Sequence, residues 1–213
     1  MDEALLAKAR QQMVDMQLRA RGIRDERVLA AMARVPRHRF IREDDVVLAY
    51  GDHPISVGFG QTISQPYIVA YMTEQLALPD AARVLEVGTG SGYQTAVLAE
   101  IAADVYTIEI VPELADQAKR LLAELGYRNV HARFGDGYAG WRDVAPFDAV
   151  IVTAAPPEVP APLKEQLKVG GRLVIPVGEG IQELRVIRRT ASGFEEEPTI
   201  AVRFVPMTGE AQK

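Results

Sequence analysis

The chain has 213 residues, 48% hydrophobic and 25% charged, a composition typical of one well-packed globular domain and too short for two ordinary ones. It contains no cysteine, which excludes a thiol nucleophile, a disulfide framework and a cysteine-ligated zinc site. The net charge of −5 argues against a surface that coats nucleic acid, and no apolar run approaches the roughly 18 residues of a membrane span.

Residues 1–10 carry acids in a helical pattern, whereas a signal peptide would have a basic head and an apolar core. We therefore expect a cytoplasmic protein with neither a nucleic-acid partner nor a membrane partner. The three histidines, His38, His53 and His131, are scattered without the spacing of metal ligands, so we expect no metal site.

Helical periodicity dominates residues 1–80. The first helix is predicted from apolar residues at helical spacing and ends at Gly22; these residues are Leu5, Ala9, Met13, Met16 and Ala20. A second helix covers residues 24–35 and ends at Pro36. After an irregular, glycine-rich stretch over residues 50–65, a third helix begins at Pro66 and ends before Pro79. These residues predict a helical cap with one unusual loop.

Short β-branched runs alternate with helical segments over residues 81–213, which predicts a parallel sheet covered on both faces. The expected parallel strands are Arg83–Val87, Asp104–Glu109, Asn129–Phe134, Phe147–Thr153 and Gly171–Val177. Two further strands, Gln182–Thr190 and Thr199–Val205, form an antiparallel pair at the sheet edge, with Glu195-Glu196-Glu197 in a solvated turn. The predicted fold class is α/β: a doubly wound, mostly parallel seven-stranded Rossmann-like sheet with the cap, in one domain over residues 1–213.

A glycine turn follows the first of these strands. Gly88, Gly90 and Gly92 stand in the pattern Glu-x-Gly-x-Gly-x-Gly, and Tyr93 occupies the place of the last glycine of the dinucleotide fingerprint. The turn is therefore not the usual pyrophosphate cradle, although by itself it leaves a dehydrogenase open. It resembles the first motif of methyltransferases that use S-adenosyl-L-methionine, in which a carboxylate near the turn helps to hold the cofactor's ammonium group.

Polar side chains stand at the carboxyl ends of the four central strands, where ligands of doubly wound sheets bind: Glu86, Glu109, Asp136 and Thr153. Glu109 is placed to accept the two ribose hydroxyls of a nucleoside. Asp136, in the turn Gly135-Asp136-Gly137, is placed to accept the adenine amine. A single acid at such a position is more often a helix cap, but the set together favours a binding site.

The segment after the fourth strand indicates which kind of chemical group would accept the methyl group. Enzymes that methylate planar amines often carry Asn or Asp before two prolines here, whereas this chain has Ala154-Ala155-Pro156-Pro157. A carboxylate acceptor needs no general base, because it is already ionised at neutral pH. Thr62, Ser64 and the first amides of the helix at Pro66 offer donors for such an anion, with Ser64 as the orienting hydroxyl. The alternative reading is that Ser64 caps that helix.

The loop over residues 52–66, DHPISVGFGQTISQP, resembles the signature loop of the protein-L-isoaspartate O-methyltransferase family. The resemblance extends over nearly the whole chain through Met13-Val14, Gly22-Ile23, Gly135-Asp136-Gly137, Phe147–Ala155, Gly170-Gly171 and Arg203–Met207. It implies methylation of the free α-carboxylate of L-isoaspartyl residues in damaged proteins. The ester then closes to a succinimide, and hydrolysis returns part of it to aspartate.

The resemblance also implies roles for single residues. Ser64 is the active-site hydroxyl, and the substrate is bound by Thr62, Ile63, Ser64, Val205, Pro206 and Thr208. S-adenosyl-L-methionine, or its product S-adenosyl-L-homocysteine, is bound by Thr62, Ser64, Glu86, Gly88, Thr89, Gly90, Glu109, Asp136, Gly137 and Thr153. We expect a monomer. Two rival functions stay open: a methyltransferase for a nucleic acid or small metabolite, and a non-catalytic module that binds the cofactor.

Overall fold

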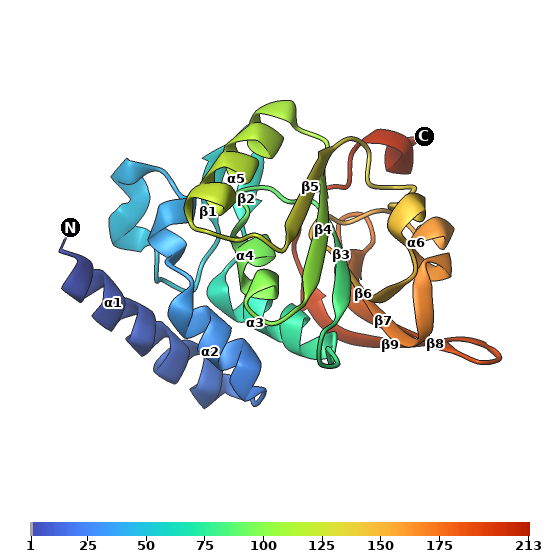
Figure 1. Cartoon of the computed structure of the whole chain (residues 1–213), viewed down its shortest axis with the longest axis horizontal. Helices are drawn as coiled ribbons and strands as arrows, with labels where there is room; N and C mark the ends of the chain where they lie inside the picture. The colour runs from blue at the N-terminus through green and yellow to red at the C-terminus, as the bar shows by residue number, and fades with distance from the viewer. Residues whose placement is uncertain (1) are drawn as a thin grey trace.

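A strongly twisted sheet forms the centre of the computed structural model, which describes residues 2–213 (Figure 1). Its strand order is β5-β4-β3-β6-β7-β8-β9. The strands are β3 (Arg83–Val87), β4 (Asp104–Glu109), β5 (Val130–Phe134), β6 (Phe147–Val152), β7 (Leu167–Val177), β8 (Gln182–Thr190) and β9 (Gly193–Val202). The predicted seven-stranded sheet is confirmed.

The sheet winds in two directions from its middle strand. β3 pairs in parallel with both β4 and β6, so the chain leaves β3 toward β5 and later returns to build the other half from β6. The pairs β7–β8 and β8–β9 are antiparallel, as expected. The switch point of the sheet therefore lies between the carboxyl ends of β3, β4 and β6, where ligands of such folds bind.

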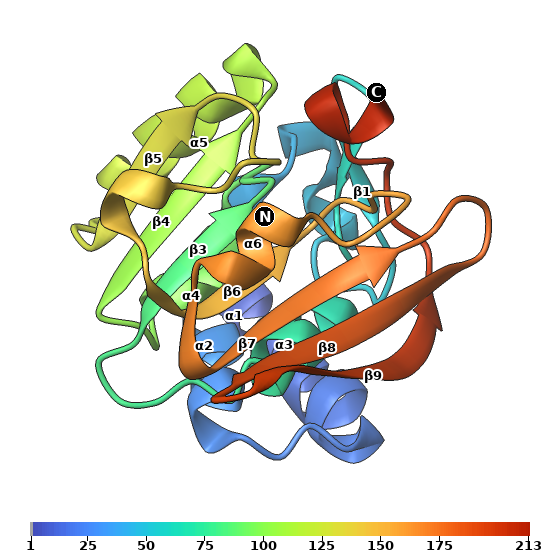
Figure 2. The same cartoon turned by 90° about the vertical axis from the view of Figure 1, so that its right-hand side faces the viewer.

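Helices cover the two faces of the sheet unequally (Figure 2). One face packs against α3 (Pro66–Gln75) and α4 (Tyr93–Ala99), with α5 (Pro112–Glu124) beside α4. The short helix α6 (Ala161–Glu165) covers the other face. Alternate residues of β3 serve the two faces, because strand side chains point to opposite sides: Val84 belongs to the α3 and α4 side and Leu85 to the α6 side.

The amino-terminal cap is helical, as predicted, and Gly22 ends its first helical run in the left-handed conformation with φ of 102°. The predicted apolar face is wrong in part, because Leu5 and Met16 are 60% and 71% exposed. A π-helical turn follows the first α-helix and shifts the register of the side chains. The elements are α1 (Glu3–Gln12), η1 (Met13–Leu18), η2 (Arg19–Arg21), α2 (Glu26–Arg34), η3 (Arg37–Phe40) and η4 (Glu43–Leu48).

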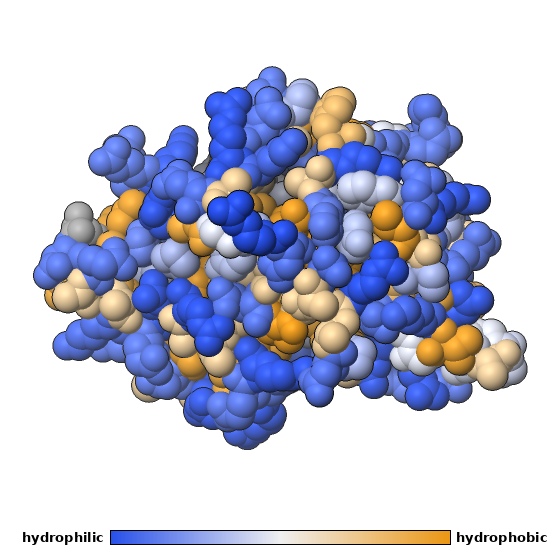
Figure 3. Space-filling model, in the orientation of Figure 1, coloured by the Kyte–Doolittle hydropathy of each residue, from blue (hydrophilic) through white to orange (hydrophobic). Residues whose placement is uncertain are grey.

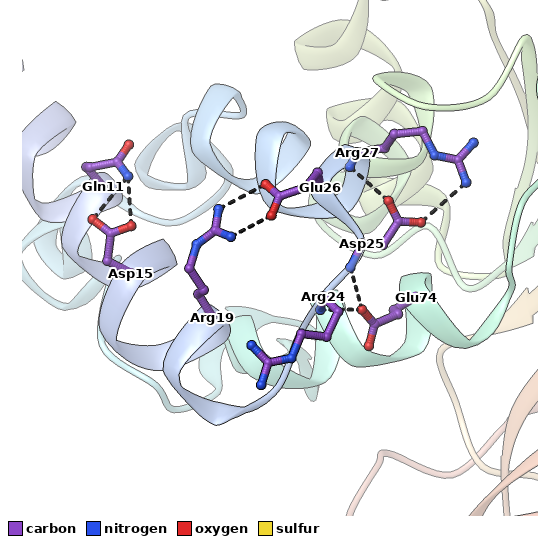
Figure 4. A network of polar contacts seen from close by, with 8 residues as sticks. All are labelled: Gln11, Asp15, Arg19, Arg24, Asp25, Glu26, Arg27 and Glu74. Carbon is purple, nitrogen blue, oxygen red and sulfur yellow. Dashed lines mark hydrogen bonds and ion pairs between the residues drawn. The ribbon is translucent and has the colours of Figure 1, made fainter.

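A polar network fixes the start of α2 to α3 (Figure 4). The Glu74 carboxylate on α3 accepts hydrogen bonds from the amides of Arg24 and Asp25, at 2.6 and 2.7 Å. Asp25 in turn caps α2 by accepting from the Arg27 amide. Within the helical cap, these bonds tie the start of α2 to α3, the helix that begins at the end of the signature loop.

One predicted irregular stretch and several predicted strand boundaries are wrong; β7, for example, begins at Leu167 and not at Gly171. The stretch over residues 50–65 contains a small hairpin of β1 (Ile55–Gly58) and β2 (Gln61–Ile63), whose short glycine-rich strands give little periodicity. β9 begins at Gly193, not at residue 199, and the predicted turn of three glutamates belongs to it. Glu195 and Glu196 pair there with Arg188 and Arg185 of β8, which offsets the low strand propensity of glutamate.

The remaining helical turns are η5 (Arg142–Val144) and η6 (Gly209–Gln212). Over residues 2–213, none of the helices is both long and apolar enough to traverse a lipid bilayer. The face drawn in Figure 3 is mostly hydrophilic, with apolar side chains in small separate patches.

Candidate active site

The glycine turn lies at the carboxyl end of β3, at the switch point of the sheet. Gly88, Gly90 and Gly92 all have positive φ, at 97°, 54° and 88°. A side chain at position 88 is also excluded by space, because a Cβ there would lie 2.3 Å from Thr153 Oγ1. Thr153, at the end of β6, donates its hydroxyl to the Gly88 carbonyl at 2.6 Å. The turn is thus held in one conformation with its backbone open to the cavity.

Glu109, at the end of β4, is bonded directly to this turn. Its Oε2 accepts from the Gly90 amide at 2.7 Å, and its Oε1 accepts from the Val111 amide at 2.9 Å. Each carboxylate oxygen can accept a second hydrogen bond. The predicted role of Glu109 toward a ribose diol is therefore compatible with its two backbone contacts.

Asp136 follows β5, and its carboxylate is held by two chain segments: its own turn and the C-terminal turn. Its Oδ1 accepts from the Tyr138 amide, and its Oδ2 accepts from the Glu210 amide of the C-terminal turn, both at 2.8 Å. Gly137 lets this loop approach β3, since a Cβ there would lie 2.3 Å from Val87 Cγ1. The adenine-binding loop predicted from the sequence is consequently tied to the end of the chain.

Glu86 differs from its predicted position. Its side chain is fully buried beneath α4 and is not part of the cavity wall. Oε2 accepts hydrogen bonds from the hydroxyls of Thr95 and Thr107 at 2.5 and 2.7 Å, whereas Oε1 is buried without a partner. Burial raises the pKa of Glu86 to about 8, against the lowering effect of the two threonines. Direct contact with a cofactor ammonium group is thus not supported, because the strand's alternation turns Glu86 toward the helix.

A large cavity adjoins the glycine turn and contains about 920 Å³ of space, counting the part open to solvent. Apart from Glu86, the predicted site residues all line it: Thr62, Ile63, Ser64, Gly88, Thr89, Gly90, Glu109, Asp136, Gly137, Thr153, Val205, Pro206 and Thr208. Residues from the loop, four strand ends and the C-terminal segment therefore meet at one place, as the order of strand ends predicted.

A second groove adjoins this cavity on the side of the hairpin. It runs between Pro54, Gln65 and residues 201–205 at the end of β9. The two hollows share a wall made of Thr62, Ser64, Ile68, Thr153, Phe204 and Val205. Ser64 therefore stands where a group in the cavity and a group in the groove would meet.

The amino terminus of α3 is already used by the chain itself. The Asp52 carboxylate accepts from the Tyr67 amide at 3.1 Å and pairs with Arg21. Pro66 has no amide hydrogen, so the first two positions of α3 do not offer the predicted anion seat. The reading of Ser64 as a cap is not supported either, because the residue at the cap position is Gln65 and α3 has no side-chain cap.

The C-terminal segment crosses the site in an extended path. The Ala155 amide donates to the Val205 carbonyl, and the Met207 amide donates to the Ala155 carbonyl, both at 2.8 Å. This pairing holds Pro206 beside the loop that follows β6. The short tail thus reaches far enough to wall both hollows.

Sequence reasoning missed the apolar part of the cavity and the residues that support it. Ile68, Val69 and Met72 of α3 face the cavity, and their helical spacing could have indicated this. Tyr93, at the place of the last fingerprint glycine, also lines the wall. Within residues 2–213, no three acidic or histidine side chains are grouped so that they could hold a metal ion.

The fold and the cavity together define the class of the protein. A glycine turn at the switch point, with carboxylates at the next two strand ends, fits the ribose and the adenine of an adenosine-containing cofactor. Open space at Gly90 allows close approach of such a ligand to the backbone. The chain is a class I methyltransferase that depends on S-adenosyl-L-methionine.

Comparison with known proteins gives the family. Residues 8–212 match the family "Protein-L-isoaspartate(D-aspartate) O-methyltransferase". Protein-L-isoaspartate O-methyltransferases from Picosynechococcus and Gloeobacter violaceus are 57% and 58% identical to it, covering 95% and 93% of this chain and 91% and 98% of their own. The chain therefore belongs to the protein-L-isoaspartate O-methyltransferase family.

Two solved structures support the same family assignment. One protein-L-isoaspartate O-methyltransferase superposes with a TM-score of 0.87 at 28% identity, over 94% of this chain and 67% of that one. A Plasmodium falciparum protein assigned to the same enzyme class, in complex with S-adenosyl-L-homocysteine, superposes with a TM-score of 0.82 at 26% identity. That comparison covers 93% of this chain and 98% of the other.

Proposed function

We propose that the cavity binds S-adenosyl-L-methionine and that the adjoining groove takes an isoaspartyl segment of a damaged polypeptide. The activity is that of the family: methylation of the free α-carboxylate of an L-isoaspartyl residue, which begins repair through a succinimide. When bound, the cofactor supplies an electrophilic methyl group. The observation that carries the proposal is the wall shared by the two hollows, which contains Ser64.

The protein's residues orient the acceptor, the isoaspartyl α-carboxylate, and remove water from it. An isoaspartyl α-carboxylate has a pKa of about 4 and is already ionised at neutral pH, so the site needs no general base. The hydroxyls of Ser64 and Thr62 are donors that can orient this anion. Ile68, Phe204 and Val205 supply apolar side chains to the shared wall, and a bound substrate would displace water from them, which would strengthen those hydrogen bonds.

Glu109, Asp136 and the glycine turn would hold the nucleoside part of the cofactor. Support comes from the free acceptor capacity of Glu109 and from the position of Asp136 on the same wall. In this proposal Thr89, Gly137 and Thr153 shape the cavity wall around the nucleoside. Val205, Pro206 and Thr208, from the C-terminal segment, cover the bound cofactor and substrate. Glu86 is assigned to the support of the turn and not to ligand contact.

A methyl-transfer assay tests the proposal and its rivals. An isoaspartyl peptide and its aspartyl twin are incubated with labelled cofactor, beside RNA and a metabolite extract. Base-labile label on the isoaspartyl peptide alone is the expected result. Label on RNA or a metabolite would support the first rival, and binding of S-adenosyl-L-homocysteine without any transfer would support the second.

We also propose that residues 1–213 act as one folding unit and as a monomer in the cytoplasm, without a nucleic-acid partner. One chain supplies every wall of both hollows, and the net charge is −5. The cap packs onto α4 and α5 through one shared apolar cluster. Light scattering during gel filtration should give the mass of a single chain, and a larger mass would overturn the monomer.

A further inference from the structure

Arg37 is a buried cation without an ionic partner. It begins the 3₁₀ turn η3 and is 0% exposed. Among residues 2–213, none of the ion pairs includes it, and its Nη1 is buried without a hydrogen bond. A buried, unpaired charge is expensive, so its persistence needs a reason beyond the filling of space.

The guanidinium binds the backbone on both sides of the hairpin of β1 and β2. Its Nε donates to the Ala49 carbonyl and its Nη2 donates to the Ser64 carbonyl, both at 2.8 Å. Ala49 precedes the signature loop and Ser64 directly follows β2, so the hairpin of β1 and β2 lies between them. Arginine suits this task because its donors form a rigid planar fork, which lysine lacks.

A further contact connects this fork to the cofactor side. The Arg37 guanidinium lies over the Tyr93 ring, with Cζ 4.8 Å from the centroid. Tyr93 is the first residue of α4, directly after the glycine turn, and lines the cavity. Phe40, from the same 3₁₀ turn as Arg37, packs edge-on against Tyr93 at 5.6 Å. One side chain therefore contacts the backbone of Ser64 and the helix that follows the glycine turn.

We propose that Arg37 is a positioning residue that fixes Ser64 relative to the glycine turn, so that the Ser64 hydroxyl is held at the point where cavity and groove meet. The inference rests on the proposed function of that site. Arg37 lines neither hollow and acts only through Ser64, Ala49 and Tyr93. Its removal should impair methyl transfer while leaving cofactor binding largely intact.

The test compares Arg37→Met and Arg37→Lys with a matched control, Arg83→Met. Arg83 also donates to a carbonyl, that of Val144 at 2.7 Å, and lies over a tyrosine ring, but at the opposite end of β3. We expect kcat on an isoaspartyl peptide to fall about 100-fold in Arg37→Met, since small misplacements of a reacting group have effects of that size. Arg37→Lys, which keeps the charge without the fork, should lose about tenfold, and Arg83→Met should keep the wild-type kcat.

Two readouts separate positioning from general damage. The Kd for S-adenosyl-L-homocysteine, measured by calorimetry, should stay within about threefold of wild type in both Arg37 variants. Amide hydrogen exchange should become faster over residues 50–65 and stay unchanged in β3 and β6. If Arg37→Met does not fold, the same measurements on Arg37→Lys decide whether Arg37 positions Ser64.

A near wild-type kcat in Arg37→Met, a loss of cofactor affinity equal to the loss of kcat, or unchanged exchange in the loop would each overturn the inference. Full recovery of kcat by lysine would also overturn it, because charge alone would then suffice. An inactive wild-type protein would instead refute the proposed function, whereas the exchange data would still decide whether Arg37 orders the loop.

Discussion

The amide of Glu210 donates a 2.8 Å hydrogen bond to Asp136 Oδ2, which joins the C-terminal turn to the strand-end loop assigned to adenine. Gly209 makes this contact sterically feasible. Its φ is 85°, and a Cβ there would lie 2.4 Å from the same Asp136 oxygen. A side chain at position 209 would therefore disturb the contact that holds the tail against Asp136.

We predict that Gly209→Ala loosens this contact and speeds the release of S-adenosyl-L-homocysteine by about tenfold, because a hydrogen bond to a charged group contributes ~1.5–3 kcal/mol. Stopped-flow displacement measures the rate. Gly126→Ala is the control, since Gly126 also has positive φ, at 88°, but open space around its Cβ position. Equal release rates for wild type and Gly209→Ala would contradict the role of the tail.

Ser64→Ala should lower kcat on an isoaspartyl peptide by about 10- to 100-fold, since the acceptor carboxylate loses one donor. The Kd for S-adenosyl-L-homocysteine should change by less than about threefold. Ser192→Ala, in the exposed turn between β8 and β9, should match wild type. Parallel losses of turnover and cofactor affinity would identify Ser64 as a structural residue instead.

Glu109→Gln should weaken cofactor binding by about 10- to 100-fold, because the amide can no longer accept from both Gly90 and Val111 and offers fewer acceptors to the ribose. Turnover at saturating cofactor should fall much less. Isothermal calorimetry and steady-state kinetics measure the two effects. Exposed Glu113→Gln, at the start of α5, serves as the control. Unchanged affinity in Glu109→Gln would remove this carboxylate from the binding site.

Glu86 predicts a pH dependence of stability. Burial raises its pKa from 4.5 to about 8, and the charge of Glu109 adds to the rise, whereas hydrogen bonds from Thr95 and Thr107 oppose it. Between these pH values the folded protein holds a proton that the unfolded chain has released. The free energy of unfolding should therefore decrease as pH rises from about 4.5 to about 8, with this group contributing at most about 1.4 kcal/mol per pH unit.

Glu86→Gln should remove this contribution, because glutamine mimics the protonated acid and can accept from both threonines. Urea unfolding at pH 5, 6.5 and 8 compares the variant with wild type and with exposed Glu158→Gln. The slope with pH should become shallower only in Glu86→Gln. The same slope in all three proteins would show that Glu86 is ionised in the folded state.

Much of the fold could be predicted because it depends on local patterns. The β-branched runs between Arg83 and Val177 are short and apolar, which is typical of buried parallel strands. The glycines at positions 88 to 92 meet a backbone requirement that few other residues satisfy. The hairpin of β1 and β2 and the first half of β9 escaped prediction. Their short or glutamate-rich sequences become strands only through pairing with a neighbour.

The sequence by itself determined which residues stand at the strand ends, and a parallel sheet brings such ends to one edge. That is why Glu109, Asp136 and Thr153 could be placed in one site. Only the tertiary structure decided that Glu86 turns under α4, that Asp52 occupies the first amide of α3, and that Arg37 holds Ser64. These contacts join segments that are distant in the sequence. Alternation along β3 places Glu86 on one face of the sheet, but which helix covers that face is set by the packing of the layers.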